Sequence, residues 1–328
     1  MLNNFINIYD FIRVVEKIRQ GEFPKIAGRI FPLKQNSKII NAWKHNESPP
    51  RNWWDIPQVL ERWNYLVTGD SSVTIHNYTA QKYFKNKNNL RAFSLCSGTG
   101  HNEINWAKTG CFEKIEGFDL SPERVKSAND FAKKENVDSI LSFNIDDAVN
   151  LKLGNESFDV IIADGALHHL TLLEEIIPTL KKALKKNGMF ILKDFVGPTR
   201  FQWTNVQIDY VNKLLNELPP KYKRKWKSNT IKNKHYKPSK LSMILSDPSE
   251  AVESSNILNV LGNHFSLLEM KPMGGTILQL LFNDIAHNFL NNDEETLKWI
   301  KYCFDFEDEL LVTKKINSDF VYAVYKKD

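Results

Sequence analysis

The sequence has few cysteines, and their spacing argues against a zinc module and against a disulfide-bonded small protein. Its 328 residues include three cysteines, Cys96, Cys111 and Cys303, and no two of them form a CxxC pair. A zinc module or a disulfide framework needs such pairs or clusters, so we expect neither and predict no metal site. A low cysteine content is also typical of a reducing compartment, and we expect a cytoplasmic protein.

Long apolar runs are absent as well. No run approaches the roughly 20 residues that a membrane-spanning helix needs. Asn7, Asp10 and Arg13 interrupt the first apolar residues, so we predict no signal peptide. The net charge of +5 is small for this length, and its sum indicates no class of partner. The composition, 42% apolar and 25% charged, is that of a globular protein with one large domain or two smaller ones.

The N-terminal part of the chain differs in texture from the rest. Apolar residues recur at helical spacing over 8–18, and an irregular stretch with four prolines follows over 22–52. Residues 53–65 are rich in aromatic side chains. These aromatic residues form either a lid over a ligand or a helical cap packed on the main domain. We predict an N-terminal helical and aromatic cap over 1–89 and the main domain over 90–328.

From residue 90 onward, short apolar runs alternate with segments of helical periodicity. The predicted strands are residues 91–95, 115–118, 140–143, 158–163, 189–192, 265–270 and 320–325. The predicted helices are residues 102–109, 122–135, 172–186, 204–217 and 276–303. This alternation predicts an α/β fold with a mostly parallel sheet and helices on both faces. The pattern loosens after residue 195, which we interpret as insertions at about 196–260 and 275–315, before and after the sixth strand.

A glycine-containing turn ends the first predicted strand. The turn, Cys96–Gly100, joins that strand to a helix, and Asp119 follows about 20 residues later at the end of the next strand. Glycines at such a turn let the backbone approach a ligand, and a carboxylate at that distance can accept both hydroxyl groups of a ribose. Together they predict a nucleoside-binding site.

Three nucleoside cofactors are candidates for this site: NAD(P), FAD and S-adenosylmethionine. A dinucleotide site needs a third glycine, but His101, Asn102 and Glu103 follow Gly100, and no GKS or GKT of a P-loop occurs. The Glu103 carboxylate would lie where a pyrophosphate should bind. A cofactor with a sulfonium and an ammonium group tolerates that charge, so electrostatics favours S-adenosylmethionine.

Four motifs resemble, in order and spacing, those of class I S-adenosylmethionine-dependent methyltransferases. They are Phe93–Gly100 with Glu103, Gly117–Ser121, Ser157–Leu170 and Leu184–Phe190. The resemblance covers residues 90–195 and implies a Rossmann-like fold with a seven-stranded sheet and S-adenosyl-L-methionine as the cofactor. A looser similarity extends to bacterial methyltransferases of surface-polysaccharide or secondary-metabolite pathways. It is carried by residues 53–57, 195–203 and 274–278.

The resemblance also implies which residues bind the cofactor. Asp119 would hold the ribose, and Asp146 or Asp147 would accept the adenine amino group, unless these two are solvated loop carboxylates. The full predicted set is Ser94, Cys96, Ser97, Gly98, Thr99, Gly100, Glu103, Asp119, Leu120, Asp146, Asp147, Asp164 and Gly165.

Two positions depart from the family pattern, which usually has glycine at 96 and often an acid at 94. Ser94 weakens the expected ion pair with the cofactor ammonium, and backbone carbonyls or Glu103 would take that role. Cys96 suits the turn if its φ is negative.

Methyl transfer from a sulfonium is an in-line displacement, in which the protein mainly aligns the reacting groups. A hydroxyl acceptor also needs a base. The predicted catalytic residues are His168, His169 and Asp194, with Asp164 as a further candidate at a strand end. An imidazole has an ordinary pKa of about 6.5, which suits proton removal at neutral pH. Two alternatives stay open: both histidines cap or pack the following helix, or the reaction needs no base.

Two further segments are candidates for substrate binding. Arg200, Gln202 and Trp203 suit a sugar, phosphate or carboxylate acceptor, although the arginine could instead fasten its loop. Residues 219–240 hold nine Lys/Arg and no acidic residue. This basic stretch is a solvated loop, a lid over an anionic acceptor or a nucleic-acid contact, and the acidic stretch near 293–309 lowers the last of these.

These observations favour a methyltransferase that acts at oxygen on a small-molecule or glycan acceptor, anionic acceptors included. An RNA or protein methyltransferase that uses residues 221–240 is the second hypothesis, and a non-catalytic cofactor-binding scaffold is the third. Nucleic acid is therefore the less favoured partner, and we predict no oligomeric state.

Overall fold

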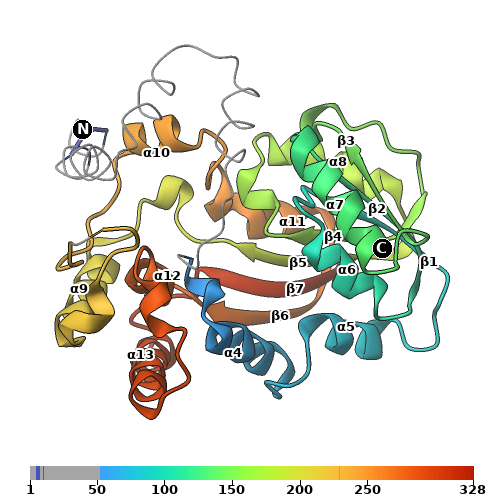
Figure 1. Ribbon diagram of the computed structural model, residues 1–328. Helices are drawn as coiled ribbons and strands as arrows, with labels where there is room; N and C mark the ends of the chain where they lie inside the picture. The colour runs from blue at the N-terminus through green and yellow to red at the C-terminus, as the bar shows by residue number, and fades with distance from the viewer. Residues whose placement is uncertain (1–4, 8–9, 11–51, 229) are drawn as a thin grey trace.

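A seven-stranded sheet forms the centre of the computed structural model, which describes residues 5–7, 10, 52–228 and 230–328 (Figure 1). The strand order is β3-β2-β1-β4-β5-β7-β6, and β7 alone runs antiparallel to its neighbours. The strands are β1 (Leu90–Leu95), β2 (Phe112–Asp119), β3 (Leu141–Ile145), β4 (Phe158–Asp164), β5 (Leu184–Phe195), β6 (Ser266–Gly274) and β7 (Phe320–Lys326). The predicted α/β fold with a mostly parallel sheet is confirmed.

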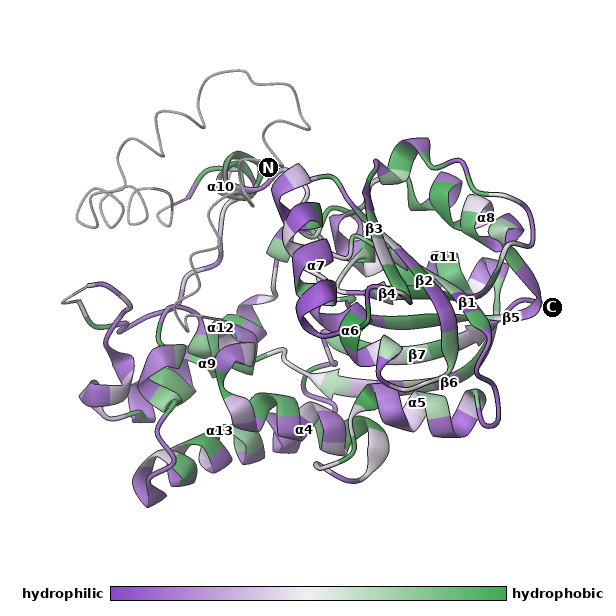
Figure 2. Cartoon of the chain, turned by 45° about the vertical axis from the view of Figure 1, so that its right-hand side comes forward, coloured by the Kyte–Doolittle hydropathy of each residue, from purple (hydrophilic) through white to green (hydrophobic). Residues whose placement is uncertain are grey.

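Helices cover both faces of the sheet. They are α4 (Pro57–Thr68), α5 (Ile75–Tyr83), α6 (His101–Ala107) and α7 (Pro122–Lys134) on one face, and α8 (Leu173–Ala183) and α11 (Ile257–His264) on the other. Ile162 of β4 belongs to the first core and its neighbour Ile161 to the second. A strand buried on both sides has apolar residues in succession, as Figure 2 shows for the central strands.

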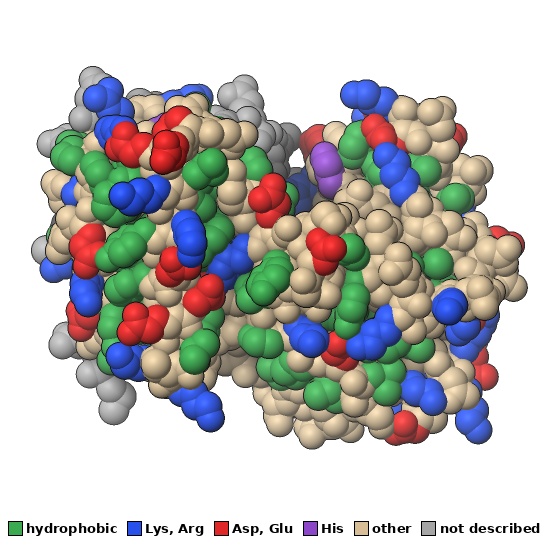
Figure 3. Space-filling view, turned by 90° about the horizontal axis from the view of Figure 1, so that it is seen from below, with side chains coloured by type: hydrophobic (Ala, Val, Ile, Leu, Met, Phe, Trp, Pro, Cys, Tyr) green, Lys and Arg blue, Asp and Glu red, His purple; other side chains and the backbone are tan. Residues whose placement is uncertain are grey.

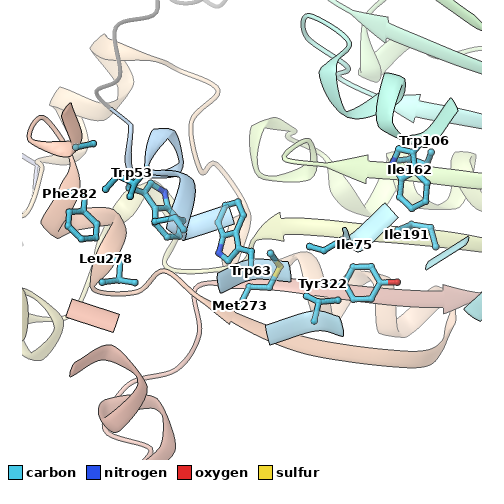
Figure 4. Close-up of a cluster of buried hydrophobic side chains, with 14 of the residues drawn as sticks. Trp53, Trp63, Ile75, Trp106, Ile162, Ile191, Met273, Leu278, Phe282 and Tyr322 are labelled. Carbon is cyan, nitrogen blue, oxygen red and sulfur yellow. The ribbon is translucent and has the colours of Figure 1, made fainter. Parts of the chain in front are cut away.

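The aromatic stretch after residue 52 packs on the sheet. A short 3-10 turn (Trp53–Asp55) precedes α4, and Pro57 begins that helix. The Trp53 ring lies 4.9 Å from Trp63 and 5.3 Å from Phe320 of β7, between centroids. Figure 4 shows Trp53 beside Phe282, with Trp63 next to Met273. These two tryptophans are therefore packed as in a cap, and the boundary at residue 89 stays a prediction. The helix predicted over 8–18 lies outside the described residues, apart from Asp10.

A group of C-terminal helices lies beside the sheet (Figure 1). These are α9 (Asn205–Glu217), α10 (Lys240–Ser246), α12 (Leu278–Phe282) and α13 (Glu294–Val312). The single helix predicted over 276–303 is wrong, because α12 ends at Phe282 and Asp284 has a φ of +66°. A new helix then begins after Asp293, whose side chain accepts a hydrogen bond from the Thr296 N–H.

A buried carboxylate ties these helices to the cap. Glu307 of α13, which is fully buried, accepts backbone N–H groups from Gly275, Ile277 and Leu278. Its Oε2 also lies 3.2 Å from Nη2 of Arg62 in α4. Since an unpaired buried charge costs several kcal/mol, this pair makes the helix group and the cap depend on each other.

The basic stretch is partly built into this helix group. Nζ of the buried Lys232 donates to the backbone oxygens of Leu280, Leu281 and Asn283, where α12 ends. Lys221 pairs with Glu295 at 2.6 Å, in the acidic stretch. The interpretation of this stretch as a solvated loop is therefore wrong for Lys232, which is buried, whereas the Lys221 side chain is 57% exposed and agrees with it. Figure 3 shows basic and acidic side chains interspersed on the face that it presents. Among the described residues, no helix has the length and apolar character that crossing a membrane requires.

Candidate functional site

The glycine-containing turn lies between β1 and α6. Gly98 and Gly100 have φ values of +55° and +79°, the left-handed region that glycine adopts without strain. A Cβ on Gly100 would come within 2.9 Å of the Phe143 ring, so no larger residue fits there without movement. Cys96 also has a positive φ, +47°, so the condition of a negative φ is not met. A side chain in this region costs about 1–2 kcal/mol, which explains why glycine suits position 96.

Asp119, the last residue of β2, faces this turn. Its Oδ2 accepts the Gly98 N–H at 3.1 Å and its Oδ1 accepts the Ser121 N–H at 2.8 Å. Nη1 of Arg124 lies 3.9 Å from Oδ2. The glycine-containing turn and Asp119, which the sequence analysis assigns to one site, are thus in contact. Leu120 follows Asp119 directly.

The two acids after β3 lie next to Asp119. The backbone N–H of Asp146 donates to the Asp119 carbonyl at 3.3 Å, and the Asp146 side chain is exposed. Asp147 accepts the Val149 N–H at 3.1 Å and caps a short 3-10 turn. The ends of β1, β2 and β3 therefore bring most of the predicted cofactor residues to one edge of the sheet.

A buried carboxylate lies under the turn. Ser94 Oγ donates to Oε1 of Glu103 at 2.6 Å, and both side chains are almost fully buried. The other oxygen, Oε2, is buried and has no hydrogen-bond partner among the described residues. Burial raises the pKa of Glu103 to about 7, and the Ser94 hydrogen bond opposes that rise. Glu103 therefore has an acceptor atom that can bind a ligand ammonium, the role that the sequence analysis assigned to backbone carbonyls or Glu103.

An ion pair lies at the end of β4. Asp164 Oδ1 lies 2.9 Å from Nζ of Lys193 in β5, and the two residues are opposite each other in the sheet. Burial raises the pKa of Asp164, and Lys193 opposes this. Gly165, with a φ of +64°, follows directly. Lys193 was missed by the sequence analysis, although its place after the apolar run of the fifth strand is a usable signal.

His168 and Asp194 form a close pair on the opposite face of the sheet. His168 Nδ1 lies 2.5 Å from Oδ1 of Asp194. Asp194 is buried, and it also accepts the N–H groups of Ala166, Leu167 and Phe195. Burial lowers the pKa of His168, but the Asp194 carboxylate outweighs it, and the net direction is upward.

Two further groups surround His168. Oε1 of Glu250 lies 3.7 Å from His168 Nε2, and burial raises the pKa of Glu250 to about 7. The His169 ring lies 4.0 Å from the His168 ring, and burial lowers the pKa of His169 well below its ordinary value. The ligand atoms of the three residues lie within 4.8 Å of one another, close enough to hold a metal ion between them. Glu250 was not predicted, because no motif or periodic pattern in the sequence marks it.

The three predicted substrate residues make contacts within the protein. Nη1 of Arg200 donates to the backbone oxygens of Pro248 and Glu250, and so holds the segment that carries Glu250. Gln202 donates to the backbone oxygen of Pro238, and the buried Trp203 donates through Nε1 to Asp319. Their roles in substrate binding stay predictions.

Comparison with known proteins identifies the family. A family model described as a methyltransferase domain matches residues 86–260, more than half of the chain. The chain therefore belongs to this family, the class I methyltransferases, and its cofactor is S-adenosylmethionine.

Individual relatives differ in what they methylate. The chain is 29% identical over 123 residues to a sterol 24-C-methyltransferase of Candida albicans, covering 37% of this chain and 33% of the relative. It is 32% identical over 106 residues to a 27-O-demethylrifamycin SV methyltransferase of Amycolatopsis mediterranei, covering 32% and 39%. The matched regions thus span well under half the length of these relatives.

A solved structure of similar extent is a putative S-adenosylmethionine-dependent methyltransferase from Listeria monocytogenes. It covers 83% of this chain and 98% of its own, with a TM-score of 0.46 and 14% identity.

Proposed function

We propose that this chain transfers a methyl group from S-adenosylmethionine to an oxygen atom of a small-molecule or glycan acceptor. The observation that carries the proposal is the His168–Asp194 pair at the carboxyl ends of β4 and β5. In open α/β sheets, ligands bind outside that edge. Arg124 lies between this region and the nucleoside side, because its charge lowers the pKa of His169, the neighbour of His168, while its Nη1 lies 3.9 Å from Asp119.

The residues present fit S-adenosylmethionine. The Asp119 carboxylate, beside the turn formed by Cys96, Ser97, Gly98, Thr99 and Gly100, would accept the ribose hydroxyl groups. Asp146 or Asp147 would accept a hydrogen bond from the adenine amino group. The rest of the cofactor site would be lined by Leu120, Asp164 and Gly165.

The buried Glu103 is the structural observation that supports the fit between these residues and the cofactor. Its Oε2 lacks a partner among the described residues, and a ligand ammonium would provide one. Ser94 positions that carboxylate instead of contributing a charge of its own. When bound, the cofactor supplies a methyl group on a positively charged sulfur.

His168 is the base in this proposal. A carboxylate at Nδ1 keeps the proton there, so Nε2 is left to accept the proton of the acceptor hydroxyl. His168 Nε2 would take the proton that the acceptor hydroxyl loses as its oxygen receives the methyl group. Asp194 acts through His168, because its oxygens already accept three backbone N–H groups. His169, held neutral by burial, packs beside the base.

Contacts of the basic stretch favour a small acceptor over RNA. Lys221 and Lys232 already have partners within the protein, so fewer charges remain for phosphates. An RNA methyltransferase would bind RNA tightly and lose that binding with added salt. The cytoplasmic location and a role in polysaccharide or natural-product synthesis stay proposals of the same kind.

The test has two stages. Calorimetry with S-adenosylmethionine should give micromolar binding, and its absence at millimolar cofactor would favour a scaffold without catalysis. Release of S-adenosylhomocysteine is then measured with a panel of hydroxylated glycosides, for the wild type, His168→Ala, His169→Ala and the control His264→Ala. His264 ends α11, before the amino end of β6, and its loss should not matter. The base assignment is wrong if His168→Ala keeps wild-type turnover on an acceptor that the wild type methylates.

A further inference from the structure

Two imidazoles and one carboxylate meet beyond the end of β4. His168 and His169 lie in the 3-10 turn that follows this strand, and Glu250 reaches them from the segment between α10 and α11. Nε2 of His168 is 3.7 Å from Oε1 of Glu250, and one ligand atom of each residue lies within 4.8 Å of the other two. Zinc bonds of about 2.0–2.2 Å place two ligand atoms about 3.3 Å apart at a tetrahedral angle, so small movements of these side chains would enclose one ion.

Both histidine rings are oriented by hydrogen bonds to other groups. Nδ1 of His168 bonds Oδ1 of Asp194 at 2.5 Å, so Nε2 is the nitrogen that faces Glu250. The His169 ring has a hydrogen bond to the backbone of Ser249, the residue before Glu250. Histidines that bind metal ions almost always have such a contact, to a carboxylate or to a backbone carbonyl, at the nitrogen that does not bind the ion.

The backbone that carries Glu250 is also held in place. Nη1 of Arg200 donates to the carbonyl oxygens of Pro248 and Glu250, and the Val252 N–H donates to the His168 carbonyl at 3.1 Å. These contacts place the Glu250 side chain beside His168 without using its carboxylate. The exposed fractions of the His168 and Glu250 side chains are 13% and 19%, so a small ion can reach them.

The charges around this cluster are compatible with a cation. Among the described residues, the carboxylates of Asp194 and Asp247 and the guanidinium groups of Arg124 and Arg200 act on its members. These two carboxylates and two guanidinium groups offset one another in formal charge, so a bound cation would pair with the Glu250 carboxylate. Imidazole nitrogens suit zinc, copper and nickel, whereas magnesium and calcium prefer sites made of oxygen atoms.

We propose that His168, His169 and Glu250 bind one divalent transition-metal ion, such as zinc, and that the bound ion inhibits methyl transfer; the inhibition rests on the proposed function. Nε2 of His168 has a single lone pair, which holds either the metal ion or the proton of the acceptor hydroxyl. The ion therefore removes the base and leaves the nucleoside contacts of Asp119 unchanged. Because the site contains no cysteine, the missing CxxC pairs, from which the sequence analysis predicts no metal site, do not bear on it.

Metal binding is measured first, by calorimetry with zinc sulfate on the full chain. The wild type should bind one zinc ion per chain in the micromolar range or tighter, and millimolar magnesium should not compete. His169→Ala and Glu250→Gln should each weaken zinc binding at least about tenfold, since loss of even an outer contact of a ligand costs about 10- to 100-fold. The matched control is Glu309→Gln, which changes an exposed carboxyl group on α13 and should bind zinc as the wild type does.

Inhibition is measured as turnover with zinc divided by turnover without it, for each protein separately, on an acceptor that the wild type methylates. At a zinc concentration about tenfold above the dissociation constant, the wild type and Glu309→Gln should lose roughly nine-tenths of their turnover, and a chelator should restore it. Glu250→Gln should keep about half or more of its own turnover at that concentration. The affinity for S-adenosylhomocysteine should not change with zinc.

Crystals of the wild type soaked in zinc give a readout that depends on no variant. An anomalous peak should lie between Nε2 of His168 and Oε1 of Glu250. Absence of zinc binding, a peak elsewhere, or wild-type zinc affinity in Glu250→Gln overturns the metal site. Bound zinc that leaves turnover unchanged, or raises it, overturns the inhibition. If the wild type binds zinc at this cluster but methylates no acceptor, the proposed function is wrong and the metal site stands.

Discussion

Cofactor binding should depend on pH through the single carboxyl group of Glu103. Burial raises its pKa to about 7, and its Oε2 lacks a partner among the described residues. Only the ionised form can pair with a ligand ammonium. Because the group gains its proton as the pH falls, affinity should be full above pH of about 8 and should fall below pH of about 7. One pH unit below the pKa about a tenth of the group is ionised, so affinity at pH of about 6 should be roughly tenfold weaker.

The assay is calorimetry with S-adenosylhomocysteine between pH of about 6 and 8, for the wild type and Glu103→Gln. The variant should bind more weakly at high pH and should lose most of the pH dependence. 5′-Methylthioadenosine serves as the control ligand and should show no such dependence, because it has no ammonium. Ser94, Asp164 and Lys193 also act on Glu103, and they remain in the variant. A wild-type affinity that does not change over this range, or a pH dependence that Glu103→Gln retains, would refute the reasoning.

Four further predictions concern binding, turnover and stability. Asp119→Ala should weaken S-adenosylhomocysteine binding by about 1–3 kcal/mol, the cost of a lost charged hydrogen bond, as calorimetry would show. His168→Ala should lower turnover about 10²- to 10⁴-fold without changing cofactor affinity, and wild-type turnover should rise as the pH rises through the upward-shifted pKa of His168. Cys96→Gly should raise the free energy of unfolding by about 0.5–1 kcal/mol, because φ is +47° there. Glu307→Gln should lower it by about 3–5 kcal/mol, because it breaks a buried pair.

Each of these predictions has a result that contradicts it. An unchanged dissociation constant in Asp119→Ala removes the ribose assignment. Turnover of His168→Ala equal to that of His264→Ala removes the base. A less stable Cys96→Gly in chemical denaturation means that the thiol makes contacts worth more than the strain. Wild-type stability of Glu307→Gln would mean that the backbone N–H groups it caps find other partners.

Much of the fold can be predicted from the local pattern of apolar residues in the sequence. The apolar runs of the buried strands predict the sheet, because each strand is covered on both faces and needs apolar residues in succession. The turn before Gly100 and the acid at Asp119 are also local signals, and the structure places them in contact at 3.1 Å. Both signals depend on backbone conformation at a strand end, which short-range sequence determines.

What the sequence missed depends on contacts between distant segments. Glu250 faces His168, and Arg200, 50 residues away in sequence, holds its backbone. Lys193 gains its partner from the neighbouring strand, and the break after α12 is stabilised by Lys232 from the basic stretch. The positive φ of Cys96 is a conformational strain that residue preference argues against. Helix and strand periodicity does not indicate such contacts, so only the structure reveals them.

A crystal structure of the protein with S-adenosylhomocysteine bound tests the central claim most directly. The ribose hydroxyl groups should contact Asp119, the ammonium should lie beside Glu103, and the sulfur should face the side of His168. A ligand held elsewhere, or a turn at Gly98 that is blocked by the protein's own side chains in the soaked crystal, would contradict it.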